Sequence, residues 1–457
     1  MNVHHPQPFI SQRPPAPAGD LPWYRFLKAV RTNALEIFPQ AAYQDDVVVQ
    51  SALGRKRFVL NGPDAIHHLL VDNIVNYRRT SATIRILRPI IGDGLFLSEG
   101  EDWRHQRRTI APALAPRVMP LLARHVVGTA RETITRLTNS TTEPVDILAT
   151  TQFLALEIAA RSMFSLEMQQ YGAALRRQIA SYAQNLARPY LLDLMLPVTI
   201  PTLRDLARAR FRAGWLRLID EIMATRLSAP EIDPPRDLFD LLRAARDPQT
   251  GAAFSDTQLR DQMTTMIVAG HETTALTLFW AIYLLASAPI EQERVAEEVR
   301  AVDFKPDSAT EVLNKLPYTR AVVNEALRLY PPAFAITRAA AGADRIGTVD
   351  IPAGSLVMVA PFVLHRHVKL WRNPDAFDPA RFLGDAAPAH RFAYLPFGVG
   401  PRICVGAQFA LTEATLVLAM LVKQFRITRA STEPVLPVAV IVTGPDHPAL
   451  FRLQPRA

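Results

Sequence analysis

The stretch FGVGPRICVGAQFALTE, residues 397–413, contains Cys404, the only cysteine among 457 residues. One thiol cannot form an internal disulfide, so Cys404 is either a small buried apolar residue or a working thiolate. Three glycines flank it: Gly398, Gly400 and Gly406. They leave room for a flat, bulky group beside the backbone and permit positive φ angles. A helical pattern begins at Gly406, so we expect a helix N-terminus and the Arg402 guanidinium to stabilise a thiolate.

The pattern Phe-Gly-x-Gly-x-Arg-x-Cys-x-Gly, continued by Ala410 and Glu413, closely resembles the haem-binding signature of the cytochrome P-450 family. Every signature position matches, which disfavours an incidental thiol in a Gly-rich turn. The resemblance implies a mainly α-helical α+β fold, with a large helical domain and a smaller β-rich lobe. It implies that Cys404 is the proximal thiolate ligand of haem b, with Phe397 packed beside the sulfur. Arg402 would bind a haem propionate.

The composition is that of a soluble globular enzyme, with 49% hydrophobic and 21% charged residues. The formal net charge of +8 suits an acidic partner, but no Lys/Arg run interleaved with aromatics indicates a nucleic-acid groove. The N-terminus has no apolar run long enough for a signal peptide or a membrane helix. We therefore expect a Pro-rich arm over residues 1–20 and a single catalytic domain over residues 21–457. Eukaryotic members of the family usually carry a membrane anchor, so the resemblance implies a cytoplasmic, bacterial-type enzyme.

The β-rich lobe is expected from residues 40–80 and 335–365. Within it, VVVQSAL and RKRFVLN flank Gly54 and predict a β-hairpin, and Gly62-Pro63 begins a helix. Residues 346–360 alternate around a Pro-x-Gly turn and predict two strands. The C-terminal stretch PVAVIVTGPDHPALFRL predicts another hairpin.

Residues 117–246 have a nearly continuous helical pattern. Within them, residues 190–197 are either a mobile lid or a buried helix end. Ser255-Asp256 then caps a long helix that runs to about Ser287, and its middle is apolar nearly all the way round. The residues His271-Glu272 inside this helix, next to Gly270 and three threonines, argue against a lipid-facing span.

The run Ala269-Gly-His-Glu-Thr-Thr274 resembles the oxygen-activation motif of the family. The resemblance implies that Ala269 lies against the haem, that the Thr273 hydroxyl holds a water beside dioxygen, and that Glu272 relays protons. The alternative is a kinked core helix whose threonines bond back to their own carbonyls. That alternative is disfavoured because it leaves Glu272 buried without a purpose.

Several cationic residues are expected around the cofactor. Trp103 and Arg107 lie one helical turn apart, which from the residues alone indicates a basic surface helix anchored by one tryptophan. The resemblance implies that both reach a haem propionate, as would Arg338, whose alternative is a strand residue facing solvent. Arg104 and Arg108 would face outward and steer an acidic electron carrier, with His105 on the surface.

A structural network is expected behind the cysteine loop. Glu325 and Arg328 form an i, i+3 pair, and Arg381 would close a three-residue network that holds the loop in place. Three scattered histidines are interpreted as surface residues rather than metal ligands: His365, His367 and His390.

Residues 84–97 are apolar and interrupted by Pro89, so they either line a cavity or fill the core. They resemble the substrate-contacting loop of the family. The expected pocket residues are all apolar: Ile84, Leu87, Ile90, Phe96, Phe334, Ile336 and Ile441.

Together these motifs predict a haem-thiolate monooxygenase that inserts one oxygen atom from dioxygen into an apolar small molecule. No flavin or iron–sulfur segment is fused, so the electrons would come from a ferredoxin or flavodoxin-type donor with its NAD(P)H reductase. Two alternatives stay open, a peroxide-using or peroxide-rearranging haem-thiolate enzyme and a non-catalytic haem-binding protein. The pair Glu272-Thr273 favours oxygen activation over both.

Overall fold

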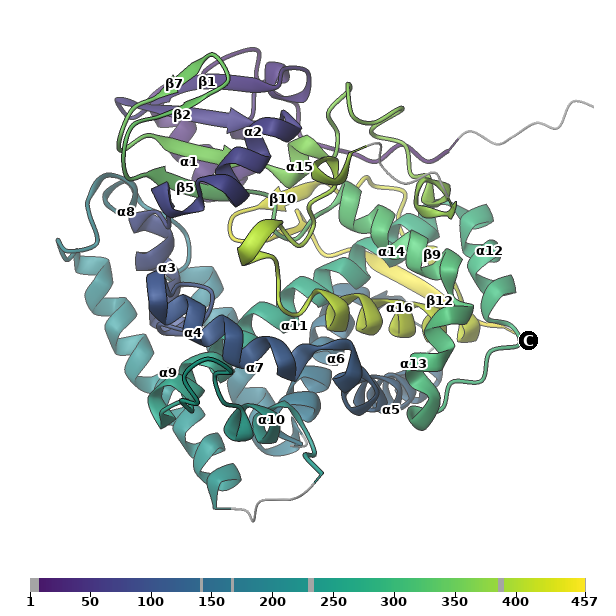
Figure 1. Cartoon of the computed structure of the whole chain (residues 1–457). Helices are drawn as coiled ribbons and strands as arrows, with labels where there is room; N and C mark the ends of the chain where they lie inside the picture. Colours follow the sequence, from purple (N-terminus) through teal and green to yellow (C-terminus); the bar gives the residue numbers. More distant parts are fainter. Residues whose placement is uncertain (1–7, 140–142, 166–167, 229–233, 385–389, 457) are drawn as a thin grey trace, which may run out of the picture.

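The computed structural model describes residues 8–139, 143–165, 168–228, 234–384 and 390–456. Helices form most of the molecule, and a five-stranded sheet lies at one end, at the upper left of Figure 1. Its strands, in the spatial order β1-β2-β8-β5-β3, are β1 Val47–Ala52, β2 Arg55–Leu60, β8 Leu356–Val359, β5 Ile336–Ala340 and β3 Tyr77–Arg78.

The predicted hairpin is confirmed. Strands β1 and β2 pair antiparallel, with Val47 opposite Leu60, and the turn residues Leu53 and Gly54 both have positive φ, at 53° and 73°. Two positive φ angles give the turn whose twist matches that of the flanking strands.

The two strands predicted within residues 346–360 exist but do not pair with each other. Instead β7 (Val349–Ile351) pairs with β6 (Asp344–Ile346), while β8 joins β2 and β5 in the large sheet. The C-terminal hairpin is confirmed as β10 (Pro437–Ala439) with β11 (Thr443–Pro445). The last strand, β12 (Leu450–Pro455), leaves this hairpin and pairs with two other strands, β9 Phe425–Arg429 and β4 Val145–Asp146.

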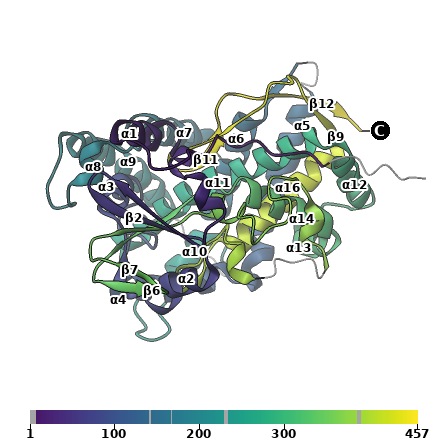
Figure 2. The same cartoon turned by 90° about the horizontal axis from the view of Figure 1, so that it is seen from above.

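The helices surround two long central members, α11 and α16, which lie side by side (Figure 2). In chain order they are α1 Trp23–Thr32, α2 Pro63–His67, α3 Ser81–Ile91, α4 Gly100–Ile110, α5 Met119–Thr138, α6 Ile147–Phe164, α7 Met168–Asn185, α8 Leu191–Met195, α9 Leu203–Leu227, α10 Leu238–Ala244, α11 Asp256–Ser287, α12 Pro289–Val299, α13 Ala309–Val312, α14 Pro317–Leu329, α15 Pro361–Leu364 and α16 Ala407–Gln424.

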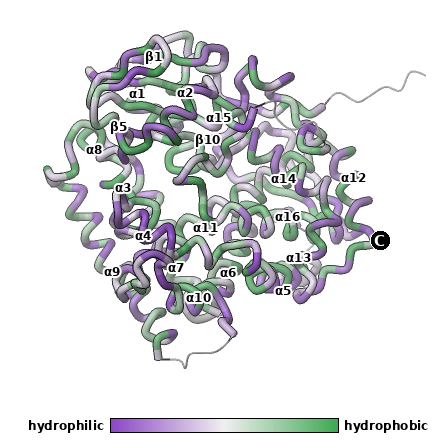
Figure 3. The backbone as a smooth tube through the Cα atoms, in the orientation of Figure 1, coloured by the Kyte–Doolittle hydropathy of each residue, from purple (hydrophilic) through white to green (hydrophobic). Residues whose placement is uncertain are grey.

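Helix α11 is the core helix that the sequence predicts. It begins with a reciprocal capping box, in which Ser255 and Gln258 each accept the other's backbone N–H. Residues 274–285 are all buried, and α16 beside them is mostly apolar (Figure 3). Among the described residues, no single helix has the length and apolar character to cross a membrane, and only α11 with α12, bent by 112° at their junction, meets that test as a pair.

The N-terminal segment lies along the body of the protein from residue 8 onward. Ile10 forms a β-bridge with Ala376, and the Ser11 N–H donates to the Asp375 carbonyl at 2.7 Å. Ser11 is buried, so this part of the predicted arm is docked rather than extended into solvent. Residues 1–7 of the arm lie outside the described residues.

The predicted network of Glu325, Arg328 and Arg381 is present. Arg328 donates from Nε and Nη2 to the Glu325 carboxylate at 2.7 and 2.8 Å, and both side chains are fully buried. Arg381 Nε lies 3.5 Å from the same carboxylate. Arg328 also donates to three backbone carbonyls, those of His365, Pro374 and Ala376. Helix α14 therefore fixes the path of the chain that leads to the cysteine loop.

Two of the three predicted surface histidines are buried, which corrects that prediction. His365 has no exposed surface, and its Nε2 accepts the Leu395 N–H at 2.8 Å. Its Nδ1 lies 3.2 Å from the Arg328 carbonyl and so carries the proton. His367 is buried as well, whereas His390 is exposed as predicted. His365 thus joins the network behind the cysteine loop, a role that its Arg-flanked sequence position does not reveal.

Residues 190–197 contain the short helix α8 (Leu191–Met195), which is held in place by a buried charge network. Arg208 donates from both Nη atoms to the Asp193 carboxylate, at 2.7 and 2.9 Å. Arg85 on α3 donates to Asp205 on α9 and to the Pro197 carbonyl. The apolar outer side of α8 is exposed, at Leu191, Leu192 and Met195. The segment is therefore not a fully buried helix end, and the mobile lid stays a prediction.

Acidification should destabilise the protein through His365. Burial lowers the pKa of His365 to about 3, whereas the same ring titrates near about 6.5 in an unfolded chain. Between these values the unfolded chain binds more protons, so the free energy of unfolding falls as the pH falls, by up to about 1.4 kcal/mol per pH unit. Urea unfolding at several pH values should show a shallower slope for His365→Asn. The exposed His390→Asn control should keep the parental slope, and a parental slope in both variants would refute this.

Removing the charge of Asp193 should destabilise the α8 region. Asp193→Asn leaves buried Arg208 with one carboxylate partner, Asp205 at 3.3 Å, besides the Leu186 carbonyl, and should lower the free energy of unfolding in urea by about 3 kcal/mol. The matched control is Asp220→Asn, because Asp220 is 52% exposed beside Arg260 and should contribute less than about 1 kcal/mol. Equal losses in the two variants would contradict the structural role assigned to the network.

Candidate active site around Cys404

The loop that carries Cys404 requires glycine at two positions. Gly398 and Gly400 have φ angles of 71° and 74°, as the sequence predicts. A Cβ atom on Gly400 would lie 2.4 Å from the Leu70 carbonyl oxygen, so no other residue fits there. Gly406 instead has φ −89° and is the N-cap of α16, and its Cβ position lies 4.0 Å from the Cys404 sulfur. The Cys404 N–H closes the loop by donating to the Phe397 carbonyl at 2.9 Å.

The Cys404 side chain is exposed, although protein surrounds it on most sides. That surrounding protein raises the pKa of the thiol by burial, while the Gly406 N–H and the Arg107 guanidinium oppose the shift. Arg107, rather than the expected Arg402, is thus the cation that acts on the sulfur. A thiol that is exposed yet surrounded by protein is open to solvent on one side, and we call the space on that side the recess.

One turn of α11 is left uncovered by side chains, and it is the turn that carries the predicted oxygen-activation motif. Ala269 is exposed, and Gly270, Glu272 and Thr273 are half-buried, although residues 274–285 are fully covered. Val268 beside this turn and Val405 beside Cys404 pack against the same hydrophobic cluster. The uncovered turn and the cysteine loop therefore lie in the same part of the molecule.

The polar groups of this turn have defined partners. The Thr273 hydroxyl donates to the Ala269 carbonyl at 2.8 Å, which is the back-bonding of the alternative interpretation. Glu272, however, is neither fully buried nor without partners. One of its oxygens accepts from Gln152 Nε2 at 3.1 Å, and the other lies 3.3 Å from His271 Nε2. Burial lowers the pKa of His271 despite the Glu272 carboxylate, which keeps the ring neutral.

Three arginines gather beside the recess: Arg79, Arg338 and Arg402. Burial and mutual repulsion hold the pKa of Arg79 well below its usual range, and they lower the pKa of Arg338 to about 10. Arg338 is 6% exposed, which excludes the solvent-facing alternative. Nε of Arg79 and Nη1 of Arg402 are buried without a hydrogen-bond partner among the described residues. Sequence reasoning missed Arg79, which belongs to no motif.

Helix α4 contacts the cysteine loop through two of the predicted residues. The Arg402 guanidinium lies 4.6 Å from the centre of the Trp103 ring, and Arg107 donates to the Ile403 carbonyl at 2.9 Å. The prediction for the outward face of this helix is wrong in part. His105 and Arg108 both bind the buried Asp247 carboxylate at 2.8 Å, so only Arg104 is free to face outward.

The expected pocket residues fall into different environments. The apolar loop predicted around Pro89 is helix α3, with Pro89 in its last turn. Ile90 is 3% exposed and belongs to the core, whereas Ile84 and Leu87 are half-buried. Phe96 lies under the Arg79 guanidinium, at 4.2 Å. The remaining three are not fully buried: Phe334, Ile336 and Ile441. Ile336 reaches to 3.8 Å from the Cβ position of Gly398, which places it beside the cysteine loop.

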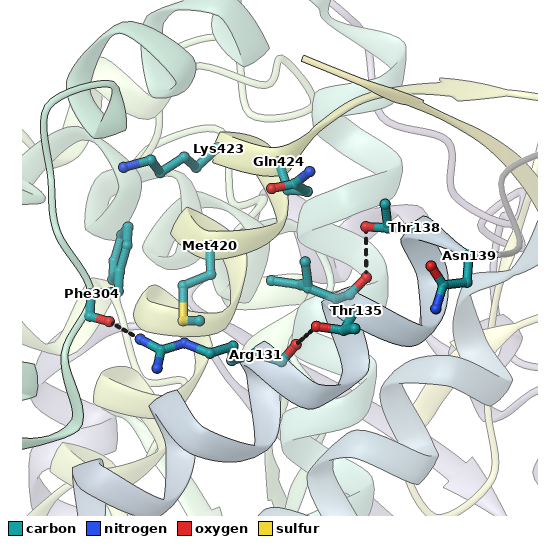
Figure 4. Close-up of a pocket in the computed structure, with 9 residues that line it drawn as sticks. Arg131, Thr135, Thr138, Asn139, Phe304, Met420, Lys423 and Gln424 are labelled. Carbon is teal, nitrogen blue, oxygen red and sulfur yellow. Dashed lines mark hydrogen bonds between the residues drawn. The ribbon is translucent and has the colours of Figure 1, made fainter. Parts of the chain in front are cut away.

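A separate cavity of about 370 Å³ lies between α5, the end of α16 and the segment after α12 (Figure 4). Both cationic side chains in its wall form hydrogen bonds to the backbone. Arg131 donates to the Phe304 carbonyl, and Lys423 donates to the Val302 carbonyl. Met420 in its wall is about 20 Å along α16 from the helix start that adjoins Cys404. The cavity is therefore not part of the candidate active site.

Comparison with known proteins agrees with this geometry. The family model "Cytochrome P450" matches residues 15–447. Cyclooctat-9-en-7-ol 5-monooxygenase of Streptomyces melanosporofaciens is 33% identical over 345 residues, covering 74% of each chain. Pentalenene oxygenase of Streptomyces avermitilis is 31% identical over 370 residues, covering 80% of each chain. The crystal structure of the cytochrome P450DA heme domain shares the fold, with a TM-score of 0.82 at 24% identity over 98% of this chain and 99% of that one.

The residues present fit haem b. A haem of this family needs a cysteine open on one side and donors for two negatively charged propionates. The exposed Cys404 thiol meets the first requirement. The buried guanidinium nitrogens of Arg79 and Arg402 that lack partners in the described chain meet the second. Family model, relatives and fold agree, and the chain belongs to the cytochrome P450 family as a haem b-dependent monooxygenase.

Proposed function

We propose that Cys404 is the proximal ligand of the haem iron and that Thr273 and Glu272 handle protons on the opposite side. The observation that carries this proposal is the exposed Cys404 thiol in a loop whose Arg402 belongs to the cluster of three arginines. When bound, haem supplies the binding and reductive activation of dioxygen. The chain supplies the ligand, the orientation and the proton path.

The surroundings of Cys404 are suited to a thiolate only when a metal binds it. Burial disfavours the charged sulfur and so raises the pKa of the thiol. The Gly406 N–H and Arg107 lower this pKa, but by less than burial raises it. Coordination to a metal ion deprotonates a thiol outright, so binding to the metal makes the thiolate the stable form of Cys404. Arg79, Arg338 and Arg402 then bind the propionates, and Trp103 covers Arg402.

The hydroxyl of Thr273 acts as an acceptor toward water. Its proton is engaged by the Ala269 carbonyl, so the oxygen lone pairs remain for a water molecule in the recess. The carboxylate of Glu272, one residue earlier, lies between Gln152 and His271. From this position the carboxylate passes protons toward that water.

The substrate is an apolar small molecule that rests against half-buried residues of α3 and β5. Ile84, Leu87 and Ile336 offer only hydrocarbon surface, which suits an apolar ligand. Two relatives are named for cyclooctat-9-en-7-ol and for pentalenene, which supports an unsaturated hydrocarbon skeleton as the first class to test.

The electron donor is a ferredoxin or flavodoxin-type protein with its NAD(P)H reductase. The net charge of +8 favours such an acidic partner, and Arg104 on α4, next to Trp103, is exposed at the surface. This donor would serve the enzyme as a separate protein, as expected for a bacterial-type member of the family.

Cys404→Ser should abolish the thiolate signature of the haem. Serine keeps the size of cysteine but replaces the sulfur ligand, so reduced protein under carbon monoxide should lose the red-shifted Soret absorption of a thiolate-ligated haem. The neighbouring Val405→Ala substitution is the control and should retain that absorption. A persistent thiolate band in folded Cys404→Ser would exclude Cys404 as the ligand.

Thr273→Ala should separate electron consumption from product formation. Without the hydroxyl, the proton path is broken, and the product formed per NAD(P)H should fall at least about tenfold while hydrogen peroxide rises. Thr277→Ala is the matched control, because Thr277 lies one turn later, is buried and bonds back to the Thr273 carbonyl. Unchanged coupling in Thr273→Ala, measured with any compound that shifts the Soret band, would contradict the role.

A further inference from the structure

Glu99 places a carboxylate inside the arginine cluster. One of its oxygens accepts the backbone N–H of Arg79 at 3.2 Å, and the other lies 3.5 Å from Arg402 Nη2. The Glu99 side chain is 42% exposed, whereas that of Arg402 is 12% exposed. Glu99 therefore sits at the outer rim of the cluster and faces inward.

The position of Glu99 in the chain does not account for this orientation. Glu99 is the N-cap residue of α4, where a side chain ordinarily accepts a backbone N–H of the first helical turn. Its side chain makes no such hydrogen bond. The carboxylate is turned away from its own helix and toward Arg79 and Arg402, so its contacts serve the cluster.

Glu99 also acts electrostatically on the whole cluster. Its charge raises the pKa of Arg79, of Arg338 and of Arg402, in each case against the burial that lowers it. Three cations and one anion thus share the place where the two propionates bind under the proposed function. The anion competes with the propionates for the same guanidinium groups.

We propose that Glu99 tunes the cofactor: its carboxylate lowers the midpoint potential of the haem iron and loosens the hold of the arginines on the propionates. This inference rests on the proposed binding of the propionates by Arg79, Arg338 and Arg402. Reduction adds one electron from an external donor to the ferric centre, so one negative charge is gained there. A fixed negative charge nearby opposes that gain.

The test compares Glu99→Gln with Glu101→Gln in the holoenzyme. Both variants remove one negative charge from α4 or its cap, but Glu101 is 77% exposed and pairs with the outward Arg104. A spectroelectrochemical titration with dithionite and redox mediators gives the midpoint potential. Transfer of haem to excess apomyoglobin gives the rate of haem loss.

Glu99→Gln should shift the midpoint potential to more positive values and slow haem loss several-fold. Glu101→Gln should match the parent in both measurements. Glu99→Asp, which keeps the charge, should restore most of the parental potential. These three results together support the inference.

Two results would overturn it. Equal potentials for Glu99→Gln and Glu101→Gln would show that Glu99 does not act on the iron. Faster haem loss without a positive shift would show that Glu99 only holds the arginines in place. Loss of the thiolate band in the parent protein itself would instead overturn the proposed function, so the two failures are distinguishable.

Discussion

The buried ion pair between Glu325 and Arg328 is the interaction on which the active-site loop depends. Both side chains are fully buried, and removing two charges from water costs several kcal/mol per ion. The structure offsets this cost by giving Arg328 three carbonyl acceptors besides the carboxylate. Because those acceptors belong to residues 365, 374 and 376, the pair specifies where the chain runs. Tyr394 adds a second tie, since its hydroxyl donates to the Asn324 carbonyl on α14.

The loop held in this way leaves the Cys404 thiol exposed, and the partly uncovered turn of α11 lies in the same part of the molecule. The surroundings of the Cys404 sulfur and the cluster of arginines differ in charge. Burial raises the pKa of the Cys404 thiol and one cation, Arg107, opposes that shift, whereas the three arginines Arg79, Arg338 and Arg402 repel one another. Such a cluster is stable only beside anions, because each buried guanidinium raises the free energy of the next. Glu99 supplies one negative charge. Under the proposed function, the propionates of haem would supply the others.

Local sequence patterns predicted those features of the site that depend on a single stretch of the sequence. The glycines at 398 and 400 have the expected positive φ, and Ser255 begins the long helix where its capping pattern indicates. Partners from distant segments were missed. Gln152 reaches Glu272 across 120 residues, and no periodicity encodes that contact.

Burial was the other property that local patterns misjudged. His365 lies in an Arg-flanked stretch typical of a surface, but its partners at Arg328 and Leu395 place it in the core. Arg108 appeared outward on the helical pattern, but Asp247 from a later loop binds it. In both cases the deciding group comes from another segment, so its effect follows from the tertiary fold and not from the neighbouring sequence.

Iron K-edge X-ray absorption of the resting holoenzyme tests the central assignment most directly, because it reports the atoms bound to the metal. The account predicts one sulfur scatterer in the first coordination shell beside the porphyrin nitrogens, since Cys404 is the only cysteine of the chain. A shell that contains only nitrogen or oxygen in correctly folded protein would contradict it.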